Sequence, residues 1–229
     1  LSVAGNTSGC YGESTTLTAS GVTNFTWSTG GNNAAISVTP NTTTTYTVNG
    51  TNNAGCPAPP VDVTVTVNAL PVVNLGVDTT VCDSIVLDAG PNLNSYAWST
   101  GASSRDLGVF NTGSYAVTVS NALNCLNSDT IDIVVNATVP VDLGVDQSIC
   151  PGTTVTLAPT AGGFGNFNWS TGANGGSISV GNTGTYVLSV DDANGCPSSD
   201  SVAVLVFAAL SGDIGNDTLI CDGQNVTLD

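Results

Sequence analysis

The sequence contains no Lys, no His and no Met, and it has a single Arg and a single Glu among 229 residues. Without His or Lys, the chain lacks the common general base at neutral pH and the amine that forms Schiff bases. The formal net charge of −16 opposes binding to nucleic acid or to anionic membrane surfaces. No apolar run approaches the roughly 20 residues that cross a bilayer. We therefore expect no catalytic site, no cofactor, no nucleic-acid partner and no membrane insertion.

Hydrophobic residues are abundant, at 41% of the chain, and they alternate with Thr, Ser and Asp. The alternation is clearest in residues 61–67, 115–119 and 201–206. A period of two indicates strands with one buried face, and it separates this chain from a disordered polar sequence. Gly, Asn and Pro clusters recur every 8 to 12 residues. This spacing predicts an all-β fold, with about seven short strands in a two-sheet sandwich.

The tetrapeptide Trp-Ser-Thr-Gly occurs three times, and both intervals are 71 residues. Such a period indicates a tandem array. We predict immunoglobulin-like repeats at residues 1–68, 69–136 and 137–207, followed at 208–229 by the start of a fourth repeat. Because the joints are short and lack Gly runs, the seven-stranded sandwiches are predicted to lie end to end as a rod. We expect the array to continue beyond both ends of this sequence.

The repeated aromatic residues are predicted to belong to the core, with a ligand platform as the weaker interpretation. Each Trp follows a second aromatic two positions earlier, which points to the same face of a strand. Each repeated Tyr begins the penultimate strand, where immunoglobulin-like sandwiches place a corner tyrosine. The predicted core positions are Trp27, Trp98 and Trp169, together with Tyr46, Tyr115 and Tyr186.

The seven cysteines occupy two positions per repeat, one before the second strand and one in the last hairpin turn. Because there is no His and no Cys-x-x-Cys spacing, they predict disulfides and not a metal site. One alternative joins the two cysteines of the same repeat. That pairing comprises Cys10 with Cys56, Cys82 with Cys125, and Cys150 with Cys196.

The geometry of a sandwich favours pairing between neighbouring repeats. The two cysteine turns of a repeat should lie at opposite ends of strands about 20 Å long, whereas bridged Cα atoms lie within about 7 Å. In an array the last hairpin of one repeat adjoins the first turn of the repeat before it. The favoured bonds are Cys10–Cys125 and Cys82–Cys196, which leaves Cys56, Cys150 and Cys221 to pair with parts outside this sequence.

Acidic turns offer a weaker lead. Asp191 and Asp192 are adjacent in a predicted hairpin turn and are candidates for calcium binding at a joint. Calcium needs several convergent oxygen ligands, and the equivalent turns of the other repeats lack the pair. Solvated turn carboxylates are the better interpretation.

Several motifs of one unit occur together at residues 150–157, 167–172, 182–190 and 192–196. In this order they resemble the immunoglobulin-like or PKD-like repeats of Bacteroidota surface proteins exported by type IX secretion, including gliding-motility adhesins. The resemblance implies an extracellular, cell-surface repeat region. It also implies O-glycosylation at Asp-Ser/Thr-aliphatic sequences. The implied positions are Thr79, Ser84, Thr130, Ser201 and Thr218, of which Thr79 fits least well.

These observations favour a structural repeat segment of an extracellular adhesin or filament, forming a stiff stalk held by disulfides. Its expected partners are further repeats of the same polypeptide and lateral neighbours in a filament. Two alternatives are a polysaccharide-binding array and an accessory module of a secreted enzyme. The adhesive or glycan target is not indicated by the residues. Measured binding to glycans would support the first alternative, and a hydrolase domain elsewhere in the polypeptide would support the second.

Overall fold

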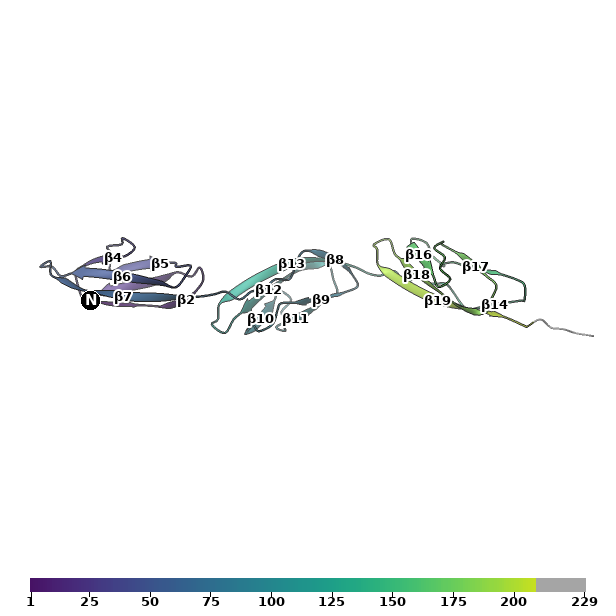
Figure 1. Cartoon of the computed structure of the whole chain (residues 1–229), viewed down its shortest axis with the longest axis horizontal. Coiled ribbons are helices and arrows are strands. Elements are labelled where there is room, and N and C mark those ends of the chain that lie inside the picture. Colours follow the sequence, from purple (N-terminus) through teal and green to yellow (C-terminus); the bar gives the residue numbers. More distant parts are fainter. Residues whose placement is uncertain (209–229) are drawn as a thin grey trace, which may run out of the picture. The chain divides into compact units, whose positions relative to one another are not determined.

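A computed structural model describes residues 1–208, and all regular structure in that range is β. The described chain forms two compact units. The first, Leu1–Val135, contains two of the predicted repeats, and the second begins at Asn136 and contains the third. Figure 1 labels most of the strands in all three.

Seven strands build the first repeat, in sheets ordered β1-β3-β5 and β2-β7-β6-β4. Strand β2 runs parallel to β7, and all other pairs in the repeat are antiparallel. The chain changes sheet at every step from β1 to β6 and stays in one sheet from β6 to β7, and the crossings from β3 to β6 are those of an immunoglobulin-like sandwich. The strands are β1 (Ser2–Gly5), β2 (Ser8–Cys10), β3 (Thr15–Ser20), β4 (Asn24–Trp27), β5 (Ala35–Val38), β6 (Thr44–Thr51) and β7 (Pro57–Asn68).

The second and third repeats share this topology except that they have no counterpart of β1. Their sheets are ordered β10-β12-β13-β8 with β9-β11, and β14-β19-β18-β16 with β15-β17. The second repeat comprises β8 (Thr79–Cys82), β9 (Ile85–Asp88), β10 (Ser95–Trp98), β11 (Asp106–Val109), β12 (Gly113–Ser120) and β13 (Leu126–Asn136). The third comprises β14 (Gln147–Ile149), β15 (Val155–Leu157), β16 (Gly165–Trp169), β17 (Ile178–Val180), β18 (Gly184–Asp191) and β19 (Pro197–Val206).

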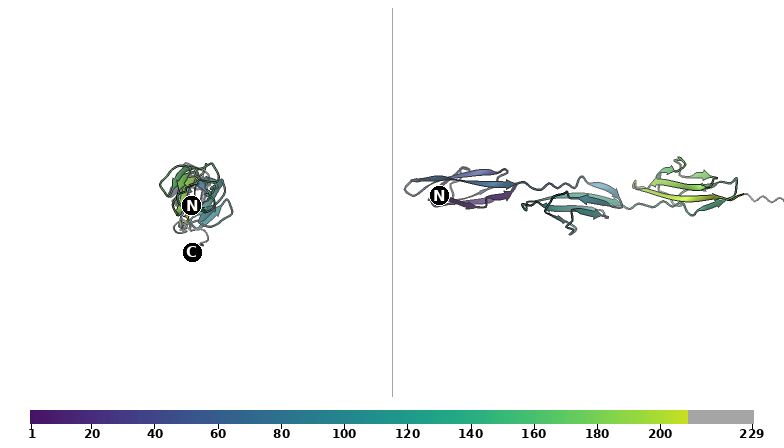
Figure 2. Two further views of the ribbon diagram at one scale, coloured as in Figure 1. Left: turned by 90° about the vertical axis from the view of Figure 1, so that its right-hand side faces the viewer. Right: turned by 60° about the horizontal axis from the view of Figure 1, so that its bottom comes forward.

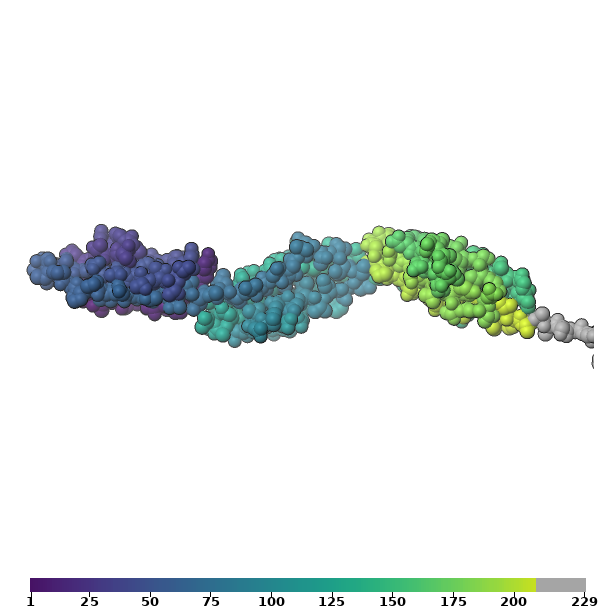
Figure 3. All heavy atoms as spheres, in the orientation of Figure 1, coloured from purple at the N-terminus to yellow at the C-terminus, as the bar shows by residue number. Residues whose placement is uncertain are grey.

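Each repeat encloses its own core between its two sheets. The strands of each repeat form layers in the ribbon view of Figure 2. Alternating residues of the strands supply this core. In β12, for example, Val117 and Val119 are buried, whereas Thr118 between them is exposed. Figure 3 shows the heavy atoms of the repeats as spheres, in the orientation of Figure 1. The immunoglobulin-like, all-β fold predicted from the sequence is therefore confirmed.

The second and third repeats contain six strands and not the expected seven. In the first repeat the leading segment forms β1 and pairs with β3. The equivalent segments of the other repeats contain no strand, because side chains of the last strand bind their N–H groups. Asp129 Oδ2 accepts from Leu75 N at 2.7 Å, and Asp200 Oδ2 accepts from Leu143 N at 2.8 Å.

The first repeat differs because it has Val61 where the others have this Asp. Val61 lies opposite Val48 of β6, the partner of the repeated Trp27, and Asp129 and Asp200 hold the same register in their repeats. A Val side chain accepts no hydrogen bond, and the leading segment of the first repeat forms β1 and pairs with β3 instead. Sequence patterns alone do not single out these two Asp residues, although their recurrence at one position is a signal.

Candidate functional site at the joint between repeats

The two cysteine positions of a repeat lie at opposite ends of its last strand. In the first repeat Cys56 directly precedes β7, whereas Cys10 pairs with Asn68 at the other end of β7. The strand has 12 residues and rises about 3.3 Å per residue, so roughly 40 Å separate the two cysteines. Bridged Cα atoms lie within about 7 Å. A bond between Cys10 and Cys56 is therefore excluded by the register.

The third repeat separates its cysteines in the same way. Cys196 directly precedes β19, and Cys150 directly follows Ile149, which pairs with Val206 at the far end of β19. A strand of 10 residues spans about 33 Å. Pairing within this repeat is excluded for the same reason.

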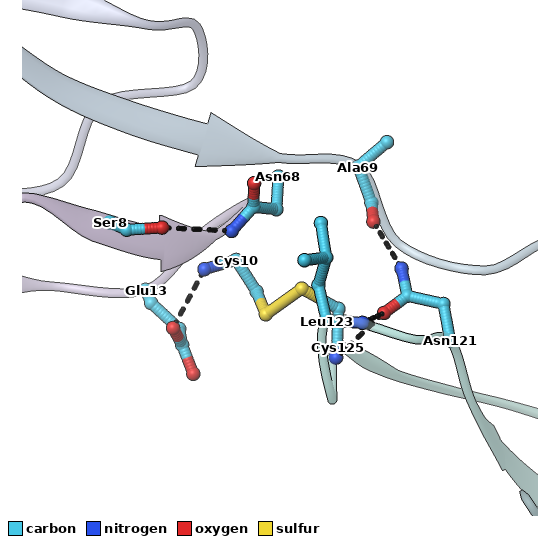
Figure 4. Close-up of a disulfide and its surroundings, with 8 residues drawn as sticks. All are labelled: Ser8, Cys10, Glu13, Asn68, Ala69, Asn121, Leu123 and Cys125. Atoms are coloured by element: carbon cyan, nitrogen blue, oxygen red, sulfur yellow. Dashed lines mark hydrogen bonds between the residues drawn. A yellow bond between two sulfur atoms is a disulfide. The ribbon is translucent and has the colours of Figure 1, made fainter. Parts of the chain in front are cut away.

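A disulfide instead joins Cys10 of the first repeat to Cys125 of the second, with Cα atoms 5.5 Å apart and a sequence separation of 115 (Figure 4). This is the pairing between repeats that the sequence favoured. Cys125 is fully buried and Cys10 is half-buried. Access of a reductant thiol is one determinant of disulfide exchange, so burial protects this bond.

A tight turn fixes Cys10. Glu13 N donates to Cys10 O at 3.0 Å, and Cys10 N donates to Glu13 Oε2 at 2.7 Å (Figure 4). Gly12 between them has a φ of 81°, a conformation that glycine adopts without steric cost. The single Glu of the chain therefore serves to hold a bridging cysteine in place.

Asn121 shapes the hairpin that carries Cys125 and also binds the incoming chain. Its Oδ1 accepts from Leu123 N and from Cys125 N, both at 3.0 Å. Its Nδ2 donates to Ala69 O at 2.9 Å, in the segment that leads from the first repeat into the second (Figure 4). Nearby, Asn127 Nδ2 donates to Pro71 O at 2.9 Å. Two side-chain hydrogen bonds to the incoming segment therefore accompany the disulfide at this joint.

Asp192 occupies the equivalent place in the third repeat and is buried, with 7% of its surface exposed. Its Oδ1 accepts from Asn194 N at 2.8 Å and from Cys196 N at 3.0 Å, as Asn121 does in its hairpin. Its Oδ2 accepts from Val139 N at 3.0 Å, in the segment leading into this repeat. The N–H groups of Val139 and then Cys196 lower the pKa of Asp192, against the opposing effect of desolvation.

The calcium candidates are engaged by protein groups. Asp191 Oδ2 accepts from Asn166 Nδ2 at 2.7 Å, and both oxygens of Asp192 accept backbone N–H groups. Within residues 1–208 there is no group of three or more His, Cys, Asp or Glu side chains that could hold a metal ion. The repeated Asp78 and Asp146 accept from the N–H groups of Asp132 and Ala203 in the last strand, both at 2.9 Å.

The remaining cysteines differ in state. Cys82 and Cys196 are disulfide-bonded. Cys56 and Cys150 are exposed thiols. Cys221 lies outside the described residues, as does Thr218. The pairing of Cys82 with Cys196 and the partners of the other three cysteines stay predictions.

The repeated aromatic residues are architectural. All three Trp side chains are buried, and each indole Nε1 donates to a backbone oxygen six residues later, at 2.8 to 3.0 Å. Tyr46 is buried, whereas Tyr115 and Tyr186 are half-buried at the edge of their cores. The hydroxyls of the latter two donate to backbone oxygens four residues upstream, at 2.7 and 3.0 Å, as corner tyrosines do.

The O-glycosylation positions within the described chain lie on the surface. Ser84, Thr130 and Ser201 are exposed, and Thr79 is half-buried. Their modification stays a prediction. Among residues 1–208, no helix is long and apolar enough to cross a membrane.

No protein-family model and no curated protein matches this sequence. Among solved structures, the chain is similar to the N-terminal eight Ig domains of Down Syndrome Cell Adhesion Molecule isoform 1.30.30, at 12% identity and a TM-score of 0.34, covering 90% of this chain and 35% of that one. It is also similar to Sidekick-1 immunoglobulin domains 1–5, at 14% identity and a TM-score of 0.31, covering 88% and 57%. The I9–I11 tandem from titin matches at 10% identity and a TM-score of 0.33, covering 90% and 100%.

The chain therefore spans about a third of the first of these proteins and somewhat over half of the second. The immunoglobulin-like fold assigned above follows from this chain's own strand order and cores.

Proposed function

We propose that this chain is a structural repeat segment of an extracellular surface protein, in which disulfides between successive repeats make a stiff stalk. The single observation that carries the proposal is the Cys10–Cys125 bond. It joins two domains that the polypeptide already connects through Ala69 and its neighbours, so the two repeats have two covalent links. Two links at one joint restrict rotation and bending far more than a single peptide linker does.

The disulfide also supports an extracellular location. Structural disulfides persist in oxidising compartments and are rare where thiol reductants are abundant. A domain of about 70 residues buries a modest share of its surface and is marginally stable. Closing a loop of 115 residues stabilises the folded state by about 4 to 5 kcal/mol in the chain-entropy model. Each repeat would then gain stability from its neighbour.

The same arrangement is proposed to continue along the array. Cys82 and Cys196 would bond to each other, and Cys56, Cys150 and Cys221 would bond to further repeats of the same polypeptide. The proposal includes an end-to-end rod, surface glycosylation and a place among the type IX-secreted repeat proteins that the motifs resemble. It assigns no catalytic role to the chain, in keeping with the lack of His and Lys.

The test compares the angle between the first two repeats in three forms of the full chain. The double variant Cys10→Ser/Cys125→Ser removes the joint disulfide. The control Cys56→Ser/Cys150→Ser removes two cysteines that are exposed thiols. Negative-stain electron microscopy measures the spread of inter-repeat angles, and small-angle X-ray scattering measures the maximum dimension.

We expect a narrow angular spread for the parent chain and for the control, and a broad spread for the joint variant. Equal spreads of the inter-repeat angle in all three forms would contradict the stiff-stalk proposal. Non-reducing peptide mapping of the same samples identifies the bonds directly. A peptide linking Cys82 to a residue other than Cys196 would overturn the proposed continuation.

A further inference from the structure

A β-bulge interrupts the pairing of β6 with β7 in the first repeat. The register that sets Val48 opposite Val61 shifts by one residue before Gly50. Two residues of β7, Pro59 and Pro60, thus lie opposite a single residue of β6. Proline has no N–H group to donate to a neighbouring strand, so a bulge is a position that accommodates it. Bulges change the direction of nearby side chains and occur often beside functional sites.

The bulge belongs to the first repeat alone among the three. The corresponding strands β12 and β13, and also β18 and β19, pair without interruption. Asn49, the residue of β6 opposite the two prolines, has Thr118 and Ser189 as its counterparts in the other repeats. A binding site added to one member of a repeat array is expected where that member departs from the common pattern.

A pocket of about 150 Å³ lies on the surface at this bulge. Its volume is well below the roughly 300 to 1,000 Å³ of pockets for drug-sized ligands, so it matches a single small ring. None of the residues that line the pocket is charged. The polar lining residues are Asn24, Thr26, Asn49 and Thr51, and the apolar ones include Pro57 and Ala58.

Two of the polar side chains are available to a ligand. Thr26 of β4 lies opposite Asn49 of β6, and both residues are exposed. Within residues 1–208, neither of these two side chains makes a hydrogen bond to another protein group. The Asn amide offers an acceptor oxygen and two N–H donors, and the Thr hydroxyl can both donate and accept. Beside them, Asn24 Nδ2 donates to Thr51 Oγ1 at 3.3 Å.

A neighbouring repeat does not cover this face of the sheet at the joint that the structure shows. The second repeat contains the counterparts of Asn24, Thr26 and Asn49, and it is joined to the first repeat by the Cys10–Cys125 disulfide. All three counterparts are exposed, namely Ser95, Ala97 and Thr118. The pocket of the first repeat therefore lies on a face that stays accessible within an array.

We propose that this pocket binds a neutral sugar ring, either as a free sugar or as one unit of a polysaccharide. Sugar hydroxyls both donate and accept hydrogen bonds, as the side chains of Asn49 and Thr26 do. The C–H groups of the ring would contact the apolar surface of Pro57 and Ala58. An anionic ligand would find no opposite charge in the lining, and the net charge of −16 would repel it. The site adds a binding activity to the stalk and does not depend on its stiffness.

The experiment follows the backbone amide signals of the full chain by two-dimensional NMR during titration with defined sugars. The probes are the methyl glycosides of glucose, galactose and mannose, and linear oligosaccharides of the same three sugars. The anionic methyl glucuronide is the comparison for charge. The variants Asn49→Ala and Thr26→Ala each remove one exposed polar side chain from the pocket. Thr118→Ala is the matched control, because it changes the counterpart of Asn49 in the second repeat.

We expect at least one neutral glycoside to shift amide signals of β4, β6 and the start of β7. Loss of the hydrogen bonds of one side chain should raise the Kd about tenfold in Asn49→Ala and in Thr26→Ala, and Thr118→Ala should leave it unchanged. Tighter binding of an oligosaccharide than of its glycoside would identify a polysaccharide as the source of the ring. Equal affinities would identify a free sugar.

Three results would overturn the proposal. The first is that no neutral sugar shifts these signals, which would mean that the bulge only accommodates the two prolines. The second is an unchanged Kd in both pocket variants, and the third is equal affinity for methyl glucuronide and the methyl glycoside of glucose. If Asn49→Ala failed to fold, Thr26→Ala would carry the same test. The Cys10–Cys125 joint is mapped separately, so none of these results bears on it.

Discussion

Asn121 and Asp192 hold the same position in successive repeats, and each faces a backbone group of matching polarity. The amide of Asn121 donates to the carbonyl oxygen of Ala69, whereas the carboxylate of Asp192 accepts the N–H of Val139. The bonds that shape the two hairpins are the same. The difference between Asn and Asp therefore reflects which backbone group the leading segment presents.

Replacing Asn121 with Asp should destabilise the second repeat's attachment at neutral pH. A carboxylate retains the hairpin bonds but places negative charge against the Ala69 carbonyl oxygen. The lost bond and the unpaired acceptors should lower the free energy of unfolding by about 1 to 3 kcal/mol. Urea denaturation of the full chain measures this. Asn52→Asp is the matched control, because Asn52 Oδ1 also accepts two backbone N–H groups of its hairpin at 3.0 Å. An equal loss of stability in both variants would contradict a role for the bond from Asn121 to Ala69.

The third repeat should lose stability as the solution is acidified. The folded-state pKa of Asp192 is lowered, chiefly by the Val139 N–H, so its contribution is complete above the unfolded-state pKa of about 3.9. That contribution disappears as the pH falls through the lowered folded value. Denaturation between pH 7 and pH 2 should show a weaker pH dependence for Asp192→Asn than for the parent chain. Identical pH profiles would show that this carboxylate does not hold the leading segment.

Removing the joint disulfide should cost more stability than removing the two exposed thiols. For Cys10→Ser/Cys125→Ser the chain-entropy model gives a loss of about 4 to 5 kcal/mol. Thermal unfolding should show a clear fall in Tm for this variant and little change for Cys56→Ser/Cys150→Ser. If the parent chain under reducing conditions unfolded at the same temperature as under oxidising conditions, the disulfide would have no stabilising role.

The single Arg of the chain gives a local electrostatic prediction. Arg105, which directly precedes β11, forms a two-pronged ion pair with Asp88 at the end of β9. This contact and the Gly90 N–H lower the pKa of Asp88 to about 2. In Arg105→Gln the pKa should rise toward the ordinary value of about 3.9, as followed by NMR titration of the side-chain carboxyl. Because the pair is exposed, stability at pH 7 should change little. If the pKa of Asp88 were the same in Arg105→Gln as in the parent chain, the ion pair would be contradicted.

Asp129, which accepts the Leu75 N–H, can be replaced with Val, the residue that the first repeat has at this position. Asp129→Val leaves the Leu75 N–H without its acceptor and should destabilise the second repeat by about 1 to 3 kcal/mol. Asp129→Asn retains an acceptor oxygen and is the control. Hydrogen exchange of the Leu75 amide should accelerate in the Val variant and much less in the Asn variant. Equal protection in both would mean that another group holds this N–H.

Local patterns predicted the parts of this protein that depend on short stretches of chain. Alternation between apolar and polar residues predicted the strands, and the Trp-Ser-Thr-Gly period predicted three repeats with a buried Trp in each. These features follow from side-chain direction and turn chemistry within a few residues. The number of strands was wrong for two repeats, because a side chain on the last strand replaced the pairing of the first.

The sequence by itself determined an all-β array in which every repeat carries one cysteine before its second strand and one in its last hairpin. Alone, it left two pairings of those cysteines open. Only the tertiary structure decided, because the parallel register of β2 on β7 sets Cys10 and Cys56 a full strand apart and brings Cys10 to Cys125. The matching of Asn121 to a carbonyl and Asp192 to an N–H was likewise decided by the fold. Backbone groups distant in sequence meet these side chains only after the chain has folded.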